Sequence, residues 1–130
     1  MMRLLLDTHI WIWSLKQPDR LSPRVRHELE DTGNELWVSP VSSWEVMLLH
    51  AKGRVQLRGN LRDWLAKATE RMREAPLTHE IVLAAQELPL AHRDPADRFL
   101  AATAGVLGLT LVTADERLLG LGQIATLANR

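Results

Sequence analysis

Apolar residues in this chain gather into short unbroken runs and into longer stretches with helical spacing, and the two kinds of segment alternate. Leu4, Leu5 and Leu6 form an unbroken apolar run, which predicts a strand buried on both faces, as in the middle of a parallel sheet. Residues 35–39 and 109–113 are predicted as further strands. Residues 76–78 and 124–127 are weaker candidates for a third strand and a short edge strand.

The stretches between these strands carry helix signals. Ser22 and Pro23 are typical of a helix N-cap and first position, and Asp94 followed by Pro95 has the same form. Pro18 is expected to end the first helix and Gly33 to follow the second. Helices are predicted over residues 8–15, 24–32, 40–51, 60–74 and 79–88, from Asp94-Pro95 onward, and for one turn at 116–119.

Strands alternating with helices indicate an α/β fold. We expect a three-layer sandwich whose central, mostly parallel sheet of four to five strands is flanked by helices. At 130 residues, the chain is predicted to be a single domain over residues 1–130.

The composition narrows the function classes. Sixteen basic residues balance 16 acidic ones, which argues against a protein that coats nucleic acid without specificity. The chain has no cysteine, so thiolate metal sites are excluded and oxygen ligands for Mg²⁺ or Mn²⁺ remain. The absence of cysteine also fits a cytoplasmic protein. No apolar run approaches the ~20 residues of a membrane helix, and no signal peptide is predicted.

Four acidic residues stand where a predicted strand ends or the next helix begins: Asp7, Glu45, Asp97 and Asp115. Such positions share one edge of a parallel sheet, where ligands bind in open α/β folds. Carboxylates brought together there repel by roughly 1 to 4 kcal/mol per pair at ~4 Å, unless a cation lies among them. The pattern therefore predicts a Mg²⁺ or Mn²⁺ site of one or two ions, and phosphodiester hydrolysis by metal-activated water.

Each of these acids also has a purely structural interpretation. Asp7 could cap the helix beginning near His9, and Ser42 with Glu45 has the form of a capping box. Asp97, at the third position of its helix, gains on the order of 0.3 to 1 kcal/mol from the helix dipole. The structural and functional interpretations do not exclude one another.

For the histidines and tryptophans near the acids, the sequence favours roles in packing, at the surface or at an interface. His9 and His92 lack the spacing of a ligand pair, so packing or surface roles are preferred. Trp11 and Trp13 could stack on bases if exposed, but tryptophans at this density favour a core or an interface.

Residues 52–73 carry a local excess of basic residues, with seven basic residues and only two acidic ones. Arg58 and Arg62 within it are candidate contacts to a phosphate backbone. The competing interpretation is a solvated helix face.

Four motifs together carry a family resemblance: Leu4-Leu5-Leu6-Asp7-Thr8, Ser43-Trp44-Glu45, the segment from Asp94 to Ala102 (DPADRFLAA), and Leu111-Val112-Thr113-Ala114-Asp115. In this order and spacing they resemble a PIN domain of the VapC-type toxin group, over essentially the whole chain. The resemblance implies a Mg²⁺- or Mn²⁺-dependent endoribonuclease acting on RNA. It also implies a homodimer, inhibited by a small antitoxin whose tail occupies the acidic groove.

The resemblance also implies roles for individual residues. Asp7, Glu45, Asp97 and Asp115 would be the acidic quartet that binds metal and carries catalysis. Asp94 would be accessory, and Thr113 would orient Asp115 or its water.

Two other functions are weighed against this one. A phosphatase or receiver domain using Asp7 as phosphate acceptor would need an acid where His9 stands, or a lysine where the nearest cation is Arg117. A non-catalytic α/β binding module would use the acids only as caps and the tryptophans as a partner surface.

Overall fold

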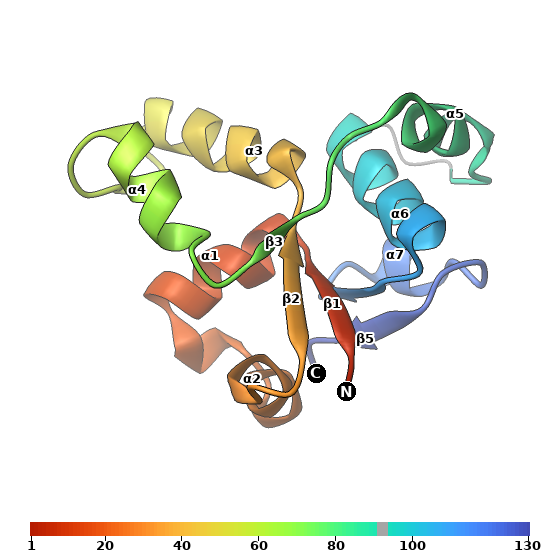
Figure 1. The fold of residues 1–130 in the computed structure, drawn as a ribbon, viewed down its shortest axis with the longest axis horizontal. Coiled ribbons are helices and arrows are strands. Elements are labelled where there is room, and N and C mark those ends of the chain that lie inside the picture. Colours follow the sequence, from red (N-terminus) through yellow and green to blue (C-terminus); the bar gives the residue numbers. More distant parts are fainter. Residues whose placement is uncertain (91–93) are drawn as a thin grey trace.

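A central parallel sheet separates two layers of helices in the computed structural model, which describes residues 1–90 and 94–130 (Figure 1). The sheet has five strands in the order β3-β2-β1-β4-β5, and every neighbouring pair is parallel. The strands are β1 (Arg3–Leu6), β2 (Glu35–Val38), β3 (Arg73–Glu74), β4 (Thr110–Thr113) and β5 (Thr126–Ala128). The three-layer α/β sandwich predicted from the sequence is confirmed.

The helices divide between the two faces of the sheet. Figure 1 shows α1 (Thr8–Lys16), α2 (Pro23–Glu30), α3 (Pro40–Ala51) and α4 (Leu61–Ala68) on one side. On the other side lie α5 (His79–Glu87), α6 (Pro95–Leu107) and α7 (Glu116–Leu119). A short 3₁₀ turn, η1 (Pro18–Arg20), links α1 to α2. No helix in the described part of the chain has the length and apolar character needed to cross a membrane.

The apolar run of β1 supplies both cores, because successive side chains of a strand point to opposite faces. Leu4 and Leu6 pack with α1, α2 and α3, whereas Leu5 packs with α6 and α7. All three leucines are at most 2% exposed. A continuous apolar run therefore marks the central strand, as the sequence predicted.

Strand order places a ligand-binding crevice at a defined point. The chain passes from β1 outward to β2 and β3, then returns to the other side of β1 to form β4 and β5. The order thus reverses between β1 and β4, and ligands of open α/β sheets bind outside the carboxyl ends of the strands at such a point. Asp7 follows β1 and Asp115 follows β4 closely.

Several helix boundaries agree with the sequence signals. Ser22 accepts a hydrogen bond from Val25 N at 3.2 Å, and Asp94 accepts one from Ala96 N at 3.0 Å, so both are N-caps with proline next along the chain. The helix after Ser22 ends at Glu30, two residues before the predicted end, because Asp31 turns the chain and accepts a hydrogen bond from Gly33 N.

The region around β3 was predicted wrongly. The helix expected over residues 60–74 ends at Ala68, and the third strand expected at residues 76–78 lies instead at Arg73–Glu74. Ala75 N still donates to Val38 O at 2.9 Å, and the pairing stops there because β2 ends at Val38 and Ser39 begins the turn into α3. The edge strand expected at residues 124–127 is likewise displaced, to Thr126–Ala128.

Candidate active site

Asp7 occupies the carboxyl end of the central strand, and the fold holds both of its carboxylate oxygens. Oδ1 accepts a hydrogen bond from Thr8 N at 2.7 Å, which makes Asp7 the N-cap of α1. Oδ2 accepts one from Thr113 Oγ1 at 2.6 Å, across from β4. The side chain is only 8% exposed, and burial is the largest cause of a pKa raised above its ordinary value of 3.8. Asp7 therefore caps a helix and is also a buried acid at the edge where ligands bind in open α/β sheets.

Thr113 connects the acids at the ends of β1 and β4. Its hydroxyl donates to Asp7 and accepts a hydrogen bond from Asp115 N at 3.1 Å. Thr113 is fully buried, so this hydroxyl is held in a fixed position. The sequence analysis expected Thr113 to orient Asp115, and the structure shows it contacting the Asp115 backbone and the Asp7 carboxylate.

Glu45 reaches the same region from α3. The capping-box alternative for Ser42 and Glu45 does not apply, because Ser39 caps α3 by accepting a hydrogen bond from Val41 N at 3.1 Å. Glu45 Oε1 instead accepts a hydrogen bond from the Thr8 hydroxyl. Burial raises the pKa of Glu45 above its ordinary value of 4.5, and the charges of Asp94 and Asp7 raise it further.

Thr8 and Ser42 are site residues that the sequence analysis missed. Thr8 Oγ1 lies 2.9 Å from Ser42 Oγ, and both side chains are buried. Thr8 thus joins the start of α1 to the Glu45 side chain on α3. In the sequence, the one sign of this role was that a hydroxyl residue, Thr8, directly follows Asp7. Glu45, to which Thr8 donates, lies 37 positions away along the chain, so the contact itself was not predictable.

The remaining acids come from the N-termini of α6 and α7. Asp94 and Asp115 are the N-caps of these helices, and Asp97 lies in the first turn of α6. Asp115 accepts a hydrogen bond from Arg117 N at 2.8 Å and forms an ion pair with Arg117 Nε at 3.5 Å.

The structure brings all of these acids to one cavity of about 570 Å³ at the β1–β4 edge. The acidic side chains lining it are Asp7, Glu45, Asp94, Asp97 and Asp115, and the basic ones are His9, Arg20 and Arg117. The pKa values of Asp7 and Glu45 are raised for the same two reasons: each carboxyl is desolvated by burial, and each lies close to other carboxylates.

The donor set fits a divalent cation with oxygen ligands. Carboxylates at the end of a buried strand are the ligands that Mg²⁺ and Mn²⁺ prefer. Within residues 1–90 and 94–130, no three His, Asp or Glu side chains are grouped tightly enough to hold a metal ion between them.

Aromatic and histidine residues near the cavity differ from one another. Trp11 is 1% exposed and belongs to the core, as expected, whereas Trp13 is half-buried and lines the acidic cavity. His9 is exposed on the same wall, with its ring centroid 5.9 Å from that of Trp13. The surface role favoured for His9 agrees with this exposure. His92 lies outside the described residues.

Arg58 and Arg62, the candidate substrate contacts, are not brought to the acids. Arg58 lies in the loop before α4 and Arg62 on α4 itself, and both side chains are exposed. Neither lines the acidic cavity. Their role in RNA binding stays a prediction.

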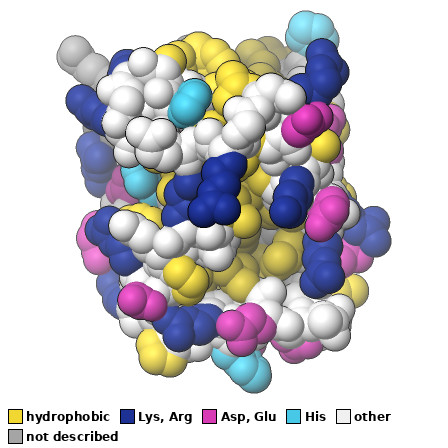
Figure 2. All heavy atoms as spheres, turned by 90° about the vertical axis from the view of Figure 1, so that its left-hand side faces the viewer, with side chains coloured by type: hydrophobic (Ala, Val, Ile, Leu, Met, Phe, Trp, Pro, Cys, Tyr) yellow, Lys and Arg dark blue, Asp and Glu magenta, His cyan; other side chains and the backbone are white. Residues whose placement is uncertain are grey.

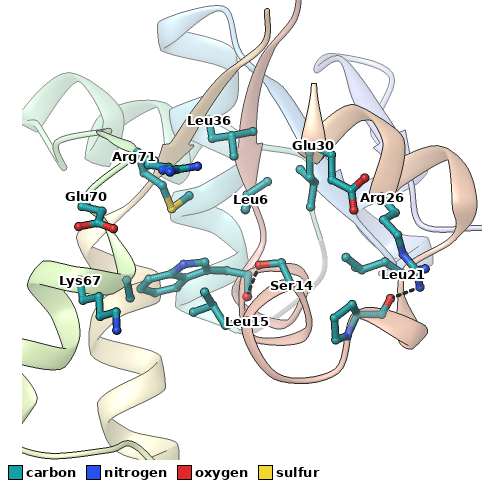
Figure 3. Close-up of a pocket in the computed structure, with 15 residues that line it drawn as sticks. Leu6, Ser14, Leu15, Leu21, Arg26, Glu30, Leu36, Lys67, Glu70 and Arg71 are labelled. Carbon is teal, nitrogen blue, oxygen red and sulfur yellow. Dashed lines mark hydrogen bonds between the residues drawn. The ribbon is translucent and has the colours of Figure 1, made fainter. Parts of the chain in front are cut away.

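A second hollow lies away from the acids, on the side of the sheet covered by α1, α2 and α4. Figure 2 shows its apolar floor with lysine and arginine side chains and some acidic side chains around it. It encloses about 340 Å³, and Figure 3 shows Leu6, Leu15 and Leu36 in it, with Arg71 and Lys67 on one side and Arg26 on the other. Among the described residues, the buried Trp11 Nε1 and Arg26 Nε have no hydrogen-bond partner, and both side chains line this hollow.

Comparison with known proteins adds to this geometry. The family model of the PIN domain matches residues 4–123. Ribonuclease VapC22 of Mycobacterium tuberculosis is 36% identical over 119 residues, which cover 91% of each chain.

Solved structures share the fold. A chain of VapBC2 from Rickettsia felis, bound to a promoter DNA fragment, superposes with a TM-score of 0.72 at 15% identity and covers 98% of both chains. A chain of DNA-bound VapBC from Salmonella typhimurium gives a TM-score of 0.71 at 19% identity, over 100% of both. The fold that carries the acid-lined cavity is shared with these solved structures, and the sequence matches the PIN domain model over most of its length. The chain therefore belongs to the PIN domain family.

Proposed function

We propose that this chain is a divalent-metal-dependent endoribonuclease, the toxin of a toxin–antitoxin pair, which hydrolyses RNA phosphodiester bonds with metal-activated water. The observation that carries the proposal is the convergence of Asp7, Glu45, Asp97 and Asp115 on one cavity at the point where the strand order reverses. The similarity to a curated ribonuclease of the PIN family supports the same reaction.

In this proposal, the quartet holds one or two Mg²⁺ or Mn²⁺ ions. A bound cation of this kind lowers the pKa of a water ligand and stabilises charge on a phosphoryl oxygen. The chain's own part is positioning: the Thr113 hydroxyl and Thr8 N fix the Asp7 carboxylate, and the Thr8 hydroxyl fixes Glu45. Asp94 is accessory through its charge beside Glu45.

Cleavage of single-stranded RNA by the purified chain tests this proposal. We expect cleavage with Mg²⁺ or Mn²⁺, none with EDTA, and recovery when metal is restored. Asp97→Asn should remove the activity while the protein stays folded, since it deletes one of several like charges. Cleavage by Asp97→Asn at the wild-type rate would reject the quartet assignment. A non-catalytic binding module would show no metal-dependent cleavage in either protein.

Arg58 and Arg62 are proposed to contact the RNA backbone beyond the cavity. Replacing both with Ala should weaken RNA binding and flatten its dependence on salt, by roughly 0.7 in the slope of log K against log salt for each phosphate that is no longer neutralised. Binding of a labelled single-stranded RNA over a series of salt concentrations measures this slope. An unchanged slope would assign these exposed arginines to a solvated helix face.

We further propose that a small antitoxin protein binds this chain, that the chain forms a homodimer, and that it acts in the cytoplasm. The tail of the antitoxin would occupy the acidic cavity. The apolar hollow between α1, α2 and α4 offers a second surface for the same partner. Its apolar floor fits the apolar face of a helix, and charged side chains of both signs line it: Lys67, Arg71 and Arg26 together with Glu30 and Glu70. The segment that fills it should therefore be apolar, with polar or charged side chains at its edges.

A further inference from the structure

Trp13 forms a cluster with His9 and Arg20 on one wall of the acidic cavity. His9 and Trp13 are four positions apart on α1, so they share one face of the helix. The ring centroids of His9 and Trp13 are 5.9 Å apart, and Arg20 Cζ lies 4.3 Å from the Trp13 ring centroid. All three side chains line the cavity that holds the quartet.

A second arginine–tryptophan cluster, around Trp37, serves as a comparison, because its arginines are paired within the protein. Arg3 and Arg73 lie over the Trp37 ring at 5.3 and 5.9 Å, and both form ion pairs with Glu35, at 3.3 and 3.5 Å. Trp37 Nε1 also donates a hydrogen bond to Glu35. In that cluster, the carboxylate of Glu35 lies against both guanidinium groups.

The Trp13 cluster lacks this internal carboxylate. In the part of the chain that the structure describes, no carboxylate forms an ion pair with Arg20 or His9. Arg117, the other cation of the cavity, is paired with Asp115 at 3.5 Å. Arg20 is exposed, so its guanidinium keeps N–H donors available for a ligand.

An anionic ligand in an acid-lined cavity needs cations on the wall beside the carboxylates. A planar guanidinium recognises phosphate through paired N–H donors and also stacks on aromatic faces. Bases of single-stranded RNA stack on tryptophan rings and on arginine planes whatever their sequence. The Trp13 cluster offers all of these contacts at one place.

We propose that Trp13, Arg20 and His9 form a nucleotide subsite, in which a base of single-stranded RNA stacks on the Trp13–Arg20 pair. Arg20 and His9 donate hydrogen bonds to the adjoining phosphates. Trp13 is six residues beyond Asp7, about 9 Å along a helix axis, so the stacked nucleotide lies near the reacting phosphate but is not part of it. The inference rests on the proposed ribonuclease function and assigns the substrate contact that a neutral protein needs.

Binding of a labelled ten-nucleotide single-stranded RNA in EDTA tests this subsite without cleavage. Trp13→Leu should raise the Kd about tenfold, because the base can no longer stack on an indole ring, and Trp13→Phe should keep most of the affinity. Arg20→Gln should weaken binding and reduce the salt slope by roughly 0.7. Trp37→Leu removes a tryptophan that also contacts arginines, and Arg24→Gln removes an exposed charge from α2, so these matched controls should bind RNA as the wild type does.

Equal RNA affinity of Trp13→Leu and wild type would overturn the subsite. If that variant bound RNA as the wild type does and weakened only the complex with the antitoxin, the cluster would be a protein-binding surface, and the RNA subsite would be rejected. The two proposals can fail separately. If the chain binds RNA through Trp13 but never cleaves it, the subsite proposal stands and the nuclease proposal is rejected. A chain that cleaves RNA while Trp13→Leu changes neither binding nor rate keeps the nuclease and loses the subsite.

Discussion

Asp7→Asn is expected to remove metal-dependent RNA cleavage and to stabilise the folded protein at neutral pH. The loss should be at least about 100-fold in the single-turnover rate, since a metal contributes several kcal/mol to transition-state stabilisation. The fold should persist, because an asparagine can still accept a hydrogen bond from Thr8 N, and its amide can donate to Thr113 Oγ1.

The gain in stability follows from the raised pKa of Asp7. Burial favours its protonated form in the folded state, so between the ordinary pKa of 3.8 and the raised folded pKa the native protein binds more protons than the unfolded chain. The free energy of unfolding therefore falls as pH rises through this window, and the full cost of the buried charge is present above it. Asparagine carries no such charge and should flatten this part of the pH profile.

Chemical denaturation at several pH values, together with single-turnover cleavage, measures both effects of Asp7→Asn. Asp31→Asn is a suitable control, because Asp31 is an exposed acid in the turn after α2 and lies outside the cavity. The control should change neither the cleavage rate nor the pH window. Wild-type cleavage by Asp7→Asn, or a loss of stability equal to unfolding, would contradict the role given to this carboxylate.

Leu15→Glu is expected to weaken the complex with the cognate antitoxin by about 30-fold or more, an effect of ~2 kcal/mol that is typical of a central interface residue. Leu15 lines the apolar hollow and is 47% exposed, so the free protein should tolerate the charge. In the complex, the carboxylate would be pressed against the apolar face of the partner and would lose its hydration.

Titration of the purified antitoxin against each variant provides the measurement for Leu15. Leu15→Met keeps the volume and apolar character and should bind as the wild type does. RNA cleavage by the isolated variants should be unchanged, since Leu15 does not line the acidic cavity. Undiminished antitoxin binding by Leu15→Glu would place the partner elsewhere on the molecule.

Sequence patterns predicted the framework of this fold because the framework depends on local rules. The run of Leu4, Leu5 and Leu6 marked the central strand, and Ser22 and Asp94 marked helix starts. Once the chain was understood as a parallel α/β sheet, the acids after strands were expected to meet at one edge. The cavity lined by all four members of the quartet agrees with that expectation.

Contacts between distant segments could not be predicted in this way. The hydrogen bond from Thr113 to Asp7 joins residues 106 positions apart, and nothing local in either segment specifies it. The two-residue strand β3 has exposed side chains and no apolar pattern, so only its pairing with β2 identifies it. The different environments of Trp11 and Trp13, by contrast, could have been predicted from the sequence. Residues two positions apart lie ~200° apart around a helix, so the two side chains cannot share a face.

The central claim is that the converging carboxylates hold a divalent cation, and a crystal structure of Mn²⁺-soaked protein tests it most directly through anomalous scattering. We predict an anomalous peak in the acidic cavity within coordination distance of Asp7 and at least one of Glu45, Asp97 and Asp115, with water completing the ligand set. The Asp7→Asn crystal, soaked in the same way, should lack or weaken that peak. A cavity without manganese under conditions where the same protein cleaves RNA would contradict the account.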